Sequence, residues 1–220
     1  MSGGFQLWAH PWWVNLLLFA PVLSFVYWRH AGLELSWRRL LYLVAFGVAF
    51  GFVEAAVVVY LRTALAVASH GASPPAANYQ QVLSSIALFP GQLLAVEICR
   101  EAATMVMLGS VALLGAARAK ERWACFLWTF AAWDITYYAG LRATLGWPSS
   151  LLDFDVLFLI PVPWASQVWF PLLVSALAMT AVAVSSLTTR LSQTKERSPL
   201  AIGADAATEA LPDGGPGAGE

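Results

Sequence analysis

The sequence predicts an all-α membrane protein with about five transmembrane helices, a short re-entrant or interfacial segment and a disordered C-terminal tail. Of the 220 residues, 59% are hydrophobic and only 11% are charged, and the mean hydropathy is +0.66. A soluble domain usually carries about 25% charged residues. Several apolar runs are about 20 residues long, which is enough to cross a bilayer. The 11 tryptophans are typical of the aromatic belts at membrane interfaces.

The first two apolar segments cover residues 11–28 and 40–61. Pro21 lies inside the first segment, so we expect a short, kinked helix there. Three arginines occupy the polar link between residues 29 and 39. After the second segment, residues 69–75 are rich in Gly, Ser and Pro, which predicts a non-helical loop.

The third segment covers residues 91–117 and follows Pro90, a residue that suits the start of a helix. Residues 82–89, just before it, are expected to form a short interfacial helix. The fourth segment covers residues 123–145 and ends where the Gly-Trp-Pro run at 146–148 interrupts the helical pattern. The chain is therefore expected to cross the membrane four times before this run.

The last part of the membrane domain contains one short and one long apolar run. Residues 149–164 include an apolar run that is too short to span, so we interpret them as a re-entrant or interfacial segment. Residues 168–187 form the fifth segment, and beyond it the chain is polar and rich in Gly, Ala and Pro. The prediction is a polytopic membrane domain at residues 1–192 and a disordered cytoplasmic tail at residues 193–220.

Basic residues concentrate in three places, namely the link after the first segment, the link after the third, and the region after the fifth. Cytoplasmic loops of membrane proteins carry an excess of Lys and Arg. All three places lie on one side if five helices cross with the N-terminus outside and the C-terminus in the cytoplasm. We therefore predict a multi-pass protein of the cell inner membrane. The oligomeric state is left open by the sequence, and a homo-oligomer and a larger membrane complex are the two assemblies considered. The sequence contains no nucleic-acid-binding motif.

The beginning of the third segment carries charge where an apolar helix is expected. Glu97 and Glu101 are four residues apart, so a helix places them on one face with Arg100 beside them. Charged groups at membrane depth cost a few kcal/mol each, and they persist mainly where they pair or line a polar cavity. The site hypothesis therefore starts at these three residues.

Two further carboxylates are expected at the same depth. Glu54 and Asp134 each lie eight residues before an arginine at the outer end of their segment, which corresponds to roughly 12 Å along a helix. Glu97 and Glu101 lie roughly 10 to 17 Å from the outer end of theirs. Four carboxylates on three helices thus converge on the outer half of the membrane, and Arg100 alone cannot neutralise all of them.

Small and aromatic residues accompany these carboxylates. Gly47, Gly51 and Ala55 form a stripe of small residues in the second segment, and such stripes let helices approach closely. Tyr137 and Tyr138 follow the aspartate of the fourth segment by three and four residues, so a phenol can reach the same cavity. Both features favour close packing of the second and fourth segments around a polar pocket.

Two uses of such a pocket follow from the residue types. Close, unpaired carboxylates cannot all be ionised in a low dielectric, so some would hold protons and act as general acids or bases. A bound cation would let all of them be charged, and oxygen ligands favour Mg²⁺, Ca²⁺ or Mn²⁺. The candidate catalytic groups, which are also the speculative metal ligands, are Glu54, Glu97, Glu101 and Asp134. The candidate substrate-binding residues are Arg100, Tyr137, Tyr138, Asp153 and Asp155.

Histidine-dependent metal centres are not favoured. The three histidines, His10, His30 and His70, are terminal or loop residues in the predicted topology. Di-iron helical bundles need a Glu-x-x-His pair on each of two helices, and the membrane segments contain no histidine. If a metal is bound, we expect a divalent cation held by oxygen atoms.

Three functions remain open from the sequence. The favoured one is a membrane-embedded enzyme that acts on a lipid-like or small amphipathic substrate, with Arg100 holding an anionic group. The second is a proton- or cation-coupled small carrier, for which the absence of an inverted repeat is unfavourable. The third is a non-catalytic subunit of a membrane complex, in which the ion cluster holds helices together. The excess of carboxylates over cations favours a functional pocket over a purely structural cluster.

Overall fold

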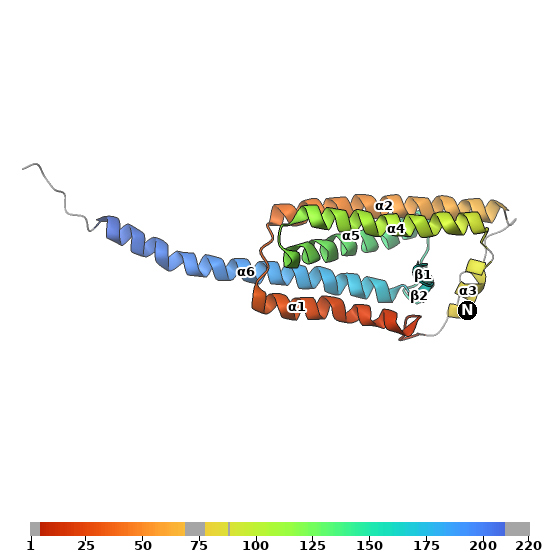
Figure 1. Cartoon of the computed structure of the whole chain (residues 1–220), viewed down its shortest axis with the longest axis horizontal. Helices are drawn as coiled ribbons and strands as arrows, with labels where there is room; N and C mark the ends of the chain where they lie inside the picture. The colour runs from red at the N-terminus through yellow and green to blue at the C-terminus, as the bar shows by residue number, and fades with distance from the viewer. Residues whose placement is uncertain (1–4, 69–77, 88, 210–220) are drawn as a thin grey trace, which may run out of the picture.

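The protein is a bundle of long helices with a small β-hairpin at one end (Figure 1). The computed structural model describes residues 5–68, 78–87 and 89–209, of which residues 67–68 and 195–209 are described by their backbone alone. The chain is mostly helical, as predicted. In order, the elements are η1 (Trp12–Leu18, a 3-10 helix), α1 (Phe19–Ala31), α2 (Trp37–Ala68), α3 (Tyr79–Ala87), α4 (Gly91–Gly115), α5 (Ala119–Leu145), β1 (Phe154–Phe158), β2 (Trp164–Gln167) and α6 (Trp169–Glu209).

Three of the described helices are long and apolar enough to cross a membrane. They are Trp37–Ala66 within α2, the whole of α4, and Trp169–Thr194 within α6, with mean hydropathies of 2.2, 1.4 and 1.9. This finding agrees with a membrane protein. Helices α1 and α5 are not among these three. Helix α1 has only 13 residues. Helix α5 is less apolar, because it carries charged residues near both ends and Asp134 in its middle.

Helix α5 lies at the centre of the bundle. It packs against α2, α4 and α6, while α1 packs on the far side of α6. The predicted stripe of small residues makes the closest of these approaches. A Cβ atom at Gly47 would lie 2.7 Å from the backbone oxygen of Thr129, and one at Gly140 would lie 2.9 Å from the Cβ of Ala55. Only glycine lets the α2 and α5 backbones lie this close.

The helices alternate in direction, so the bundle has two chemically different ends (Figure 1). At one end, which we call the basic end, Arg118 pairs with Glu34 and Lys120 donates hydrogen bonds to the carbonyls of Ala31 and Gly32 at 2.6 and 2.8 Å. Arg190 donates to the carbonyl of Leu35 there as well. The three basic regions of the sequence are therefore joined at one end of the bundle.

The opposite end, which we call the hairpin end, corrects the prediction of an all-α chain. Instead of forming only a re-entrant or interfacial segment, residues 149–167 fold into an antiparallel pair of strands in which Phe154 lies opposite Gln167 and Val156 lies opposite Ala165. His10 extends the pairing by exchanging two backbone hydrogen bonds of 2.8 Å with Ala165. β-branched and aromatic residues favour these strands.

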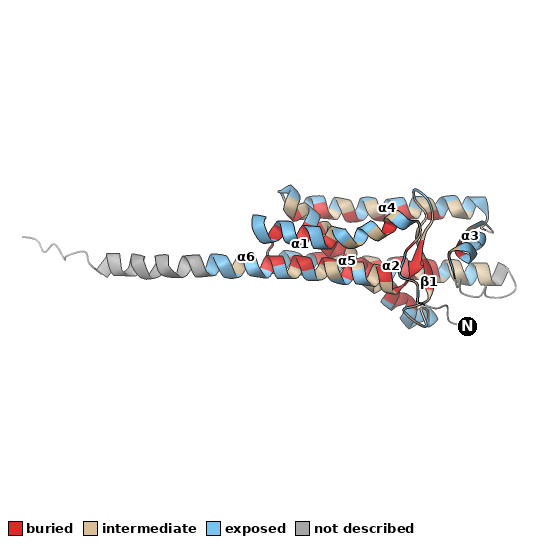
Figure 2. Cartoon of the chain, turned by 90° about the horizontal axis from the view of Figure 1, so that it is seen from below, coloured by how far each residue is buried: buried red, intermediate tan, exposed pale blue. Residues whose placement is uncertain are grey.

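Buried residues gather on the inner faces of the helices and in β1, and the outward faces of the bundle are exposed (Figure 2). The outward faces carry many large apolar side chains, including Phe52, Val106 and Leu114. Large exposed apolar surfaces are unusual on monomeric soluble proteins. The distribution of burial therefore fits helices that are surrounded by lipid.

Two parts of the prediction fall partly or wholly outside the described structure. The loop predicted at residues 69–75, which includes His70, lies within the undescribed residues 69–77. Helix α6 continues to Glu209, past residue 193, where the predicted tail begins. Because side chains beyond residue 194 and the whole of residues 210–220 are not described, disorder of the tail stays a prediction.

Candidate functional site

A cavity of about 330 Å³ lies between α1, α4, α5, α6 and the β-hairpin. This volume is near the lower end of the range of about 300–1,000 Å³ for small-molecule sites. Its polar lining residues are Glu54, Arg100, Glu101, Thr104, Asp134, Tyr137, Tyr138 and Asp155. Its aromatic lining residues are Trp123, Phe126, Phe130, Trp133, Phe158, Trp164 and Phe170, together with the two tyrosines. The cavity is thus an aromatic chamber with several carboxylates in its wall.

Arg100 is held by two carboxylates from two helices. Its guanidinium forms ion pairs with Glu54 of α2 and, at 2.9 Å, with Glu97 of its own helix α4. Thr104, one turn further along α4, donates a hydrogen bond of 2.8 Å to the second oxygen of Glu54. This cluster ties α4 to α2. Because two carboxylates already surround Arg100, the predicted use of this residue to hold an anionic substrate is not favoured by the geometry.

Glu101 and Asp134 differ from this cluster because neither forms a salt bridge within the described residues. Glu101 accepts a hydrogen bond of 2.7 Å from the backbone N–H of Leu159, just after β1. Asp134 accepts one of 2.8 Å from the hydroxyl of Ser175 on α6. Both side chains are at least nine-tenths buried. Two carboxylates with neutral partners therefore face the same cavity.

Asp155 of β1 forms the floor of the cavity at the hairpin end. It accepts a hydrogen bond of 3.0 Å from the Tyr138 hydroxyl and lies 3.7 Å from the Arg62 guanidinium. Arg62 in turn lies 4.0 Å from the centre of the Trp147 ring, a cation–π distance. Burial raises the pKa of the Asp155 carboxyl above its ordinary value of 3.8, and Arg62 and Tyr138 oppose that rise.

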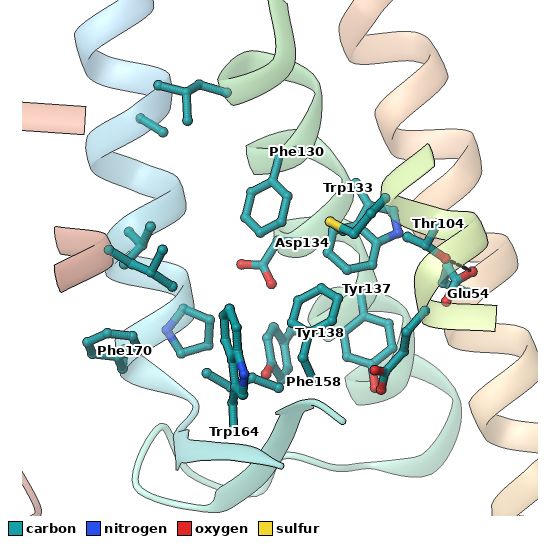
Figure 3. Close-up of a pocket in the computed structure, with 18 of the residues that line it drawn as sticks. Glu54, Thr104, Phe130, Trp133, Asp134, Tyr137, Tyr138, Phe158, Trp164 and Phe170 are labelled. Carbon is teal, nitrogen blue, oxygen red and sulfur yellow. Dashed lines mark hydrogen bonds between the residues drawn. The ribbon is translucent and has the colours of Figure 1, made fainter. Parts of the chain in front are cut away.

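The aromatic rings form a connected wall around Asp134 (Figure 3). The Asp134 carboxylate points into the space between Phe130, Tyr138 and the rings at the hairpin end. Ring centres are 5.4 Å apart between Phe130 and Trp133 and 5.5 Å apart between Phe158 and Trp164. The rings come from α5, β1 and β2, and Phe170 adds another from α6.

Seven of the nine predicted site residues line this one cavity: Glu54, Arg100, Glu101, Asp134, Tyr137, Tyr138 and Asp155. Glu97 lies behind the wall, where it supports Arg100. Asp153 is placed elsewhere, since its carboxylate accepts hydrogen bonds from Ser149 and from the backbone N–H of Ser150. It therefore stabilises the turn before β1 rather than the cavity.

Sequence reasoning missed the partners that the tertiary structure supplies, namely Ser175, Arg62 and the Leu159 amide. It also assigned the tryptophans to interfacial belts, whereas Trp133 and Trp164 line the cavity. A signal for the aromatic wall was present in α5, where Trp123, Phe126, Phe130, Trp133 and Tyr137 recur every three or four residues. That spacing places them on one face of a helix.

The speculative metal site is not supported by the side-chain geometry. Within the part of the chain that the structure describes, no three His, Cys, Asp or Glu side chains lie close enough together to hold an ion. Glu54 and Glu97 are turned toward Arg100, while Glu101 and Asp134 are bonded to different elements. The four predicted ligands therefore share a cavity without forming one coordination sphere.

Comparisons of the chain with protein-family models, with curated proteins and with solved structures find no match. The interpretation of the cavity therefore rests on its own geometry and chemistry.

Proposed function

We propose that the protein is a multi-pass inner-membrane protein whose cavity binds a lipid-like or small amphipathic molecule. In this proposal the apolar part of the ligand lies against the aromatic wall, and its polar part meets Glu101 and Asp134. The observation that carries the proposal is the combination, in one cavity, of a nearly continuous aromatic wall with two buried carboxylates that have only neutral partners. Ligand pockets typically combine apolar walls with a few placed polar groups.

Five membrane crossings, with the basic end in the cytoplasm, fit the arrangement of the chain. The ends of α1 and α4 and the starts of α2 and α5 lie at the basic end, and α6 runs toward it (Figure 1). Nine of the twelve Lys and Arg residues belong to the segments that meet there. With the basic end in the cytoplasm, as the positive-inside rule favours, the hairpin end and the cavity would lie in the outer half of the membrane.

We propose further that ligands enter from the bilayer, between α1 and α4. These helices border the cavity, but α1 packs on α6 while α4 packs on α5. On the central helix, Trp123 is 43% exposed, and its ring stacks on Phe126 at 5.5 Å, which stacks on Phe130 at 5.9 Å. Such partly exposed rings would form an apolar path from the lipid to Asp134.

The chemistry that these residues could supply is proton transfer. A carboxyl group within hydrogen-bond reach of a ligand can act as a general acid or base. Glu101 and Asp134 suit this role because neither forms a salt bridge among the described residues, and their hydrogen-bond donors are a backbone amide and a hydroxyl. The favoured function is thus an enzyme that uses Glu101 and Asp134 in acid–base steps, with Tyr138 and Asp155 at the end of the cavity.

A carrier that couples a small solute to protons remains the alternative, and one observation favours it. Glu101 holds the chain just after β1 through the Leu159 amide, so a change in its charge would alter how the hairpin is attached over the cavity. Proton flux into liposomes that carry the purified protein, with and without added solute, separates the two. A solute-dependent flux would favour the carrier.

The proposal is tested by filling the cavity. Ala178 of α6 lines it and is buried, so Ala178→Trp should occupy the space that the ligand needs. Ala103 of α4 is exposed on the outside of the bundle, so Ala103→Trp is the matched control. Native mass spectrometry of the purified variants measures retained small molecules and lipids. We expect a bound species with the native protein and the control, and its loss from Ala178→Trp.

Equal occupancy of Ala178→Trp and Ala103→Trp would place the bound molecules on the outer surface and would count against a ligand cavity. A melting temperature measured for both variants shows whether the larger side chain has disturbed the bundle. If Ala178→Trp is unstable, Val174→Phe tests the same wall of the cavity from the neighbouring turn of α6.

A further inference from the structure

We infer that the ligand of the cavity is an organic cation, in which an ammonium group with apolar substituents is bound by Asp134 and the surrounding rings. This inference deepens the proposed function and rests on it, because it assigns a ligand class to the same cavity. It also reverses the polarity expected from the sequence, where Arg100 was assigned to an anionic group.

The cavity is surrounded by more carboxylates than cations. Five carboxylates line it or lie directly behind it, against the two guanidinium groups of Arg62 and Arg100. Arg100 is shared by Glu54 and Glu97, and Arg62 lies beside Asp155. Among the described residues no ion pair reaches Glu101 or Asp134. An anionic ligand would be repelled here, whereas a cation would supply the missing charge.

The wall of the cavity is built largely from aromatic rings. Cations are attracted to the faces of aromatic rings, and Trp gives the strongest attraction. Aromatic cages are a common way to bind quaternary ammonium groups. Phe130, Tyr138 and Trp164 lie around the Asp134 carboxylate (Figure 3). A carboxylate within such a cage gives an ammonium group both an anionic partner and aromatic faces. An uncharged apolar ligand would leave the carboxylate without a charged partner.

Two hydrogen-bond donors in the wall of the cavity have no acceptor among the described residues. The indole N–H groups of Trp133 and Trp164 are buried and have no hydrogen-bond acceptor in the described part of the protein. Both side chains line the cavity, and Trp133 is 7% exposed. Buried donors without acceptors cost free energy, so they point to a bound molecule or water. An oxygen atom close to the ammonium group of a ligand would satisfy them.

A matched pair of probes tests the assignment. Benzyltrimethylammonium and neopentylbenzene have the same shape, but only the first is charged. Equilibrium dialysis of each against the full-length protein in dodecyl maltoside micelles, with empty micelles as the blank, gives both affinities. We expect the native protein to prefer the cation by at least roughly tenfold. In Asp134→Asn this preference should nearly disappear.

The control is Glu34→Gln, which removes an exposed carboxylate at the basic end and should leave the preference unchanged. If Asp134→Asn does not fold, Phe130→Leu keeps the carboxylate but removes one ring face. In that variant the preference for the cation should fall by a factor of roughly two to ten. An unchanged preference in a folded Asp134→Asn or Phe130→Leu variant would overturn the inference.

Equal binding of the two probes to the native protein would also overturn it, and it would leave the cavity as a site for neutral amphipathic molecules. Binding of neither probe, together with a species retained by the native protein and lost from Ala178→Trp, would reject the cation while the proposed function survives. Binding of neither probe and no retained species would reject both.

Discussion

At the scale of single residues, the site is characterised by an excess of carboxylates over cationic side chains. Arg100 bridges Glu54 and Glu97 across two helices, and each of these carboxylates is less than a tenth exposed. Breaking a buried ion pair by removing one partner is far more costly than never having formed it, because an uncompensated charge remains. Arg100 therefore matters more to the stability of the bundle than its single charge suggests.

Arg100→Gln should lower the free energy of unfolding by about 3–5 kcal/mol, because it leaves two buried carboxylates without their cation. Unfolding in detergent micelles, followed by circular dichroism, measures the loss. Adding Glu54→Gln to this variant should recover part of the stability, since one uncompensated charge is then removed. Glu34→Gln, at the exposed pair with Arg118 at the basic end, should change little, and an equal loss in both variants would contradict this account.

The charge state of Asp155 should make stability depend on pH. Burial raises the pKa of Asp155 in the folded protein, so the folded state binds this proton more strongly than the unfolded state does. The resulting stabilisation is full below the ordinary pKa of 3.8, and it is lost as the pH rises through the folded pKa. Arg62→Gln removes a charge that lowers this pKa, so the loss should extend to higher pH.

Melting temperatures of the native protein, Arg62→Gln and Asp155→Asn, measured from acid to neutral pH, test this expectation. Asp155→Asn should show a weaker dependence on pH, because the titrating group is gone. An unchanged transition in Arg62→Gln would show that Arg62 does not act on this carboxyl, and a shift toward lower pH would contradict the sign of its effect.

At the scale of elements, the contact between α2 and α5 places Glu54 beside the cavity. The predicted small-residue stripe faces α5, so the two helices lie closer than larger side chains would allow. The hairpin is the second positioning element. It is bound to α4 through Glu101, to α5 through Tyr138, and to the N-terminal segment through His10. These attachments close the outer end of the cavity.

Gly47→Ala should destabilise the protein by about 1–3 kcal/mol, because its Cβ would lie 2.7 Å from the Thr129 oxygen and 2.8 Å from the Ala132 Cβ. Gly109→Ala in α4 is the matched control, since a Cβ there meets nothing within 4 Å. In this variant the better helix propensity of alanine should stabilise the protein by up to about 1 kcal/mol. Chemical unfolding in micelles measures both, and effects of the same sign would argue against the close α2–α5 contact.

At the scale of the whole molecule, the two ends of the bundle differ in charge and in structure. The basic end joins three segments that are far apart in the sequence, while the hairpin end holds the carboxylates and closes the cavity. An asymmetric charge distribution of this kind orients a membrane protein, because Lys and Arg are retained in the cytoplasm. The proposed cavity would then face the outside of the cell.

Cysteine labelling tests this orientation. In a variant without Cys99 and Cys125, Leu151→Cys places a thiol at the hairpin end and Glu34→Cys places one at the basic end, and both native side chains are exposed. A membrane-impermeant maleimide should label the first in intact cells and the second only after permeabilisation. The reverse pattern would show that the topology is inverted. Labelling of both thiols from outside would contradict an odd number of membrane crossings between residues 34 and 151.

Much of the architecture could be predicted from the sequence, because hydropathy and helical period are local properties. The membrane class, the long apolar helices, the packing stripe at Gly47 and Gly51, and most of the cavity's carboxylates follow from spacing along single segments. The basic regions could also be assigned to a common end by counting crossings. In the structure these regions do contact one another.

The cross-helix partners of Glu54, Glu101 and Asp134 were decided by the tertiary structure alone. Glu54 and Arg100 are 46 residues apart, Asp134 and Ser175 are 41 apart, and Glu101 and the Leu159 amide are 58 apart. No local pattern specifies contacts across such separations, because they depend on how the helices rotate and pack. The same packing turned the aromatic face of α5 inward and paired residues 154–167 as a hairpin. Sequence alone therefore predicted a carboxylate-rich membrane bundle, and only the fold separated the carboxylates that pair with arginines from Glu101 and Asp134, which face the aromatic cavity without a salt bridge.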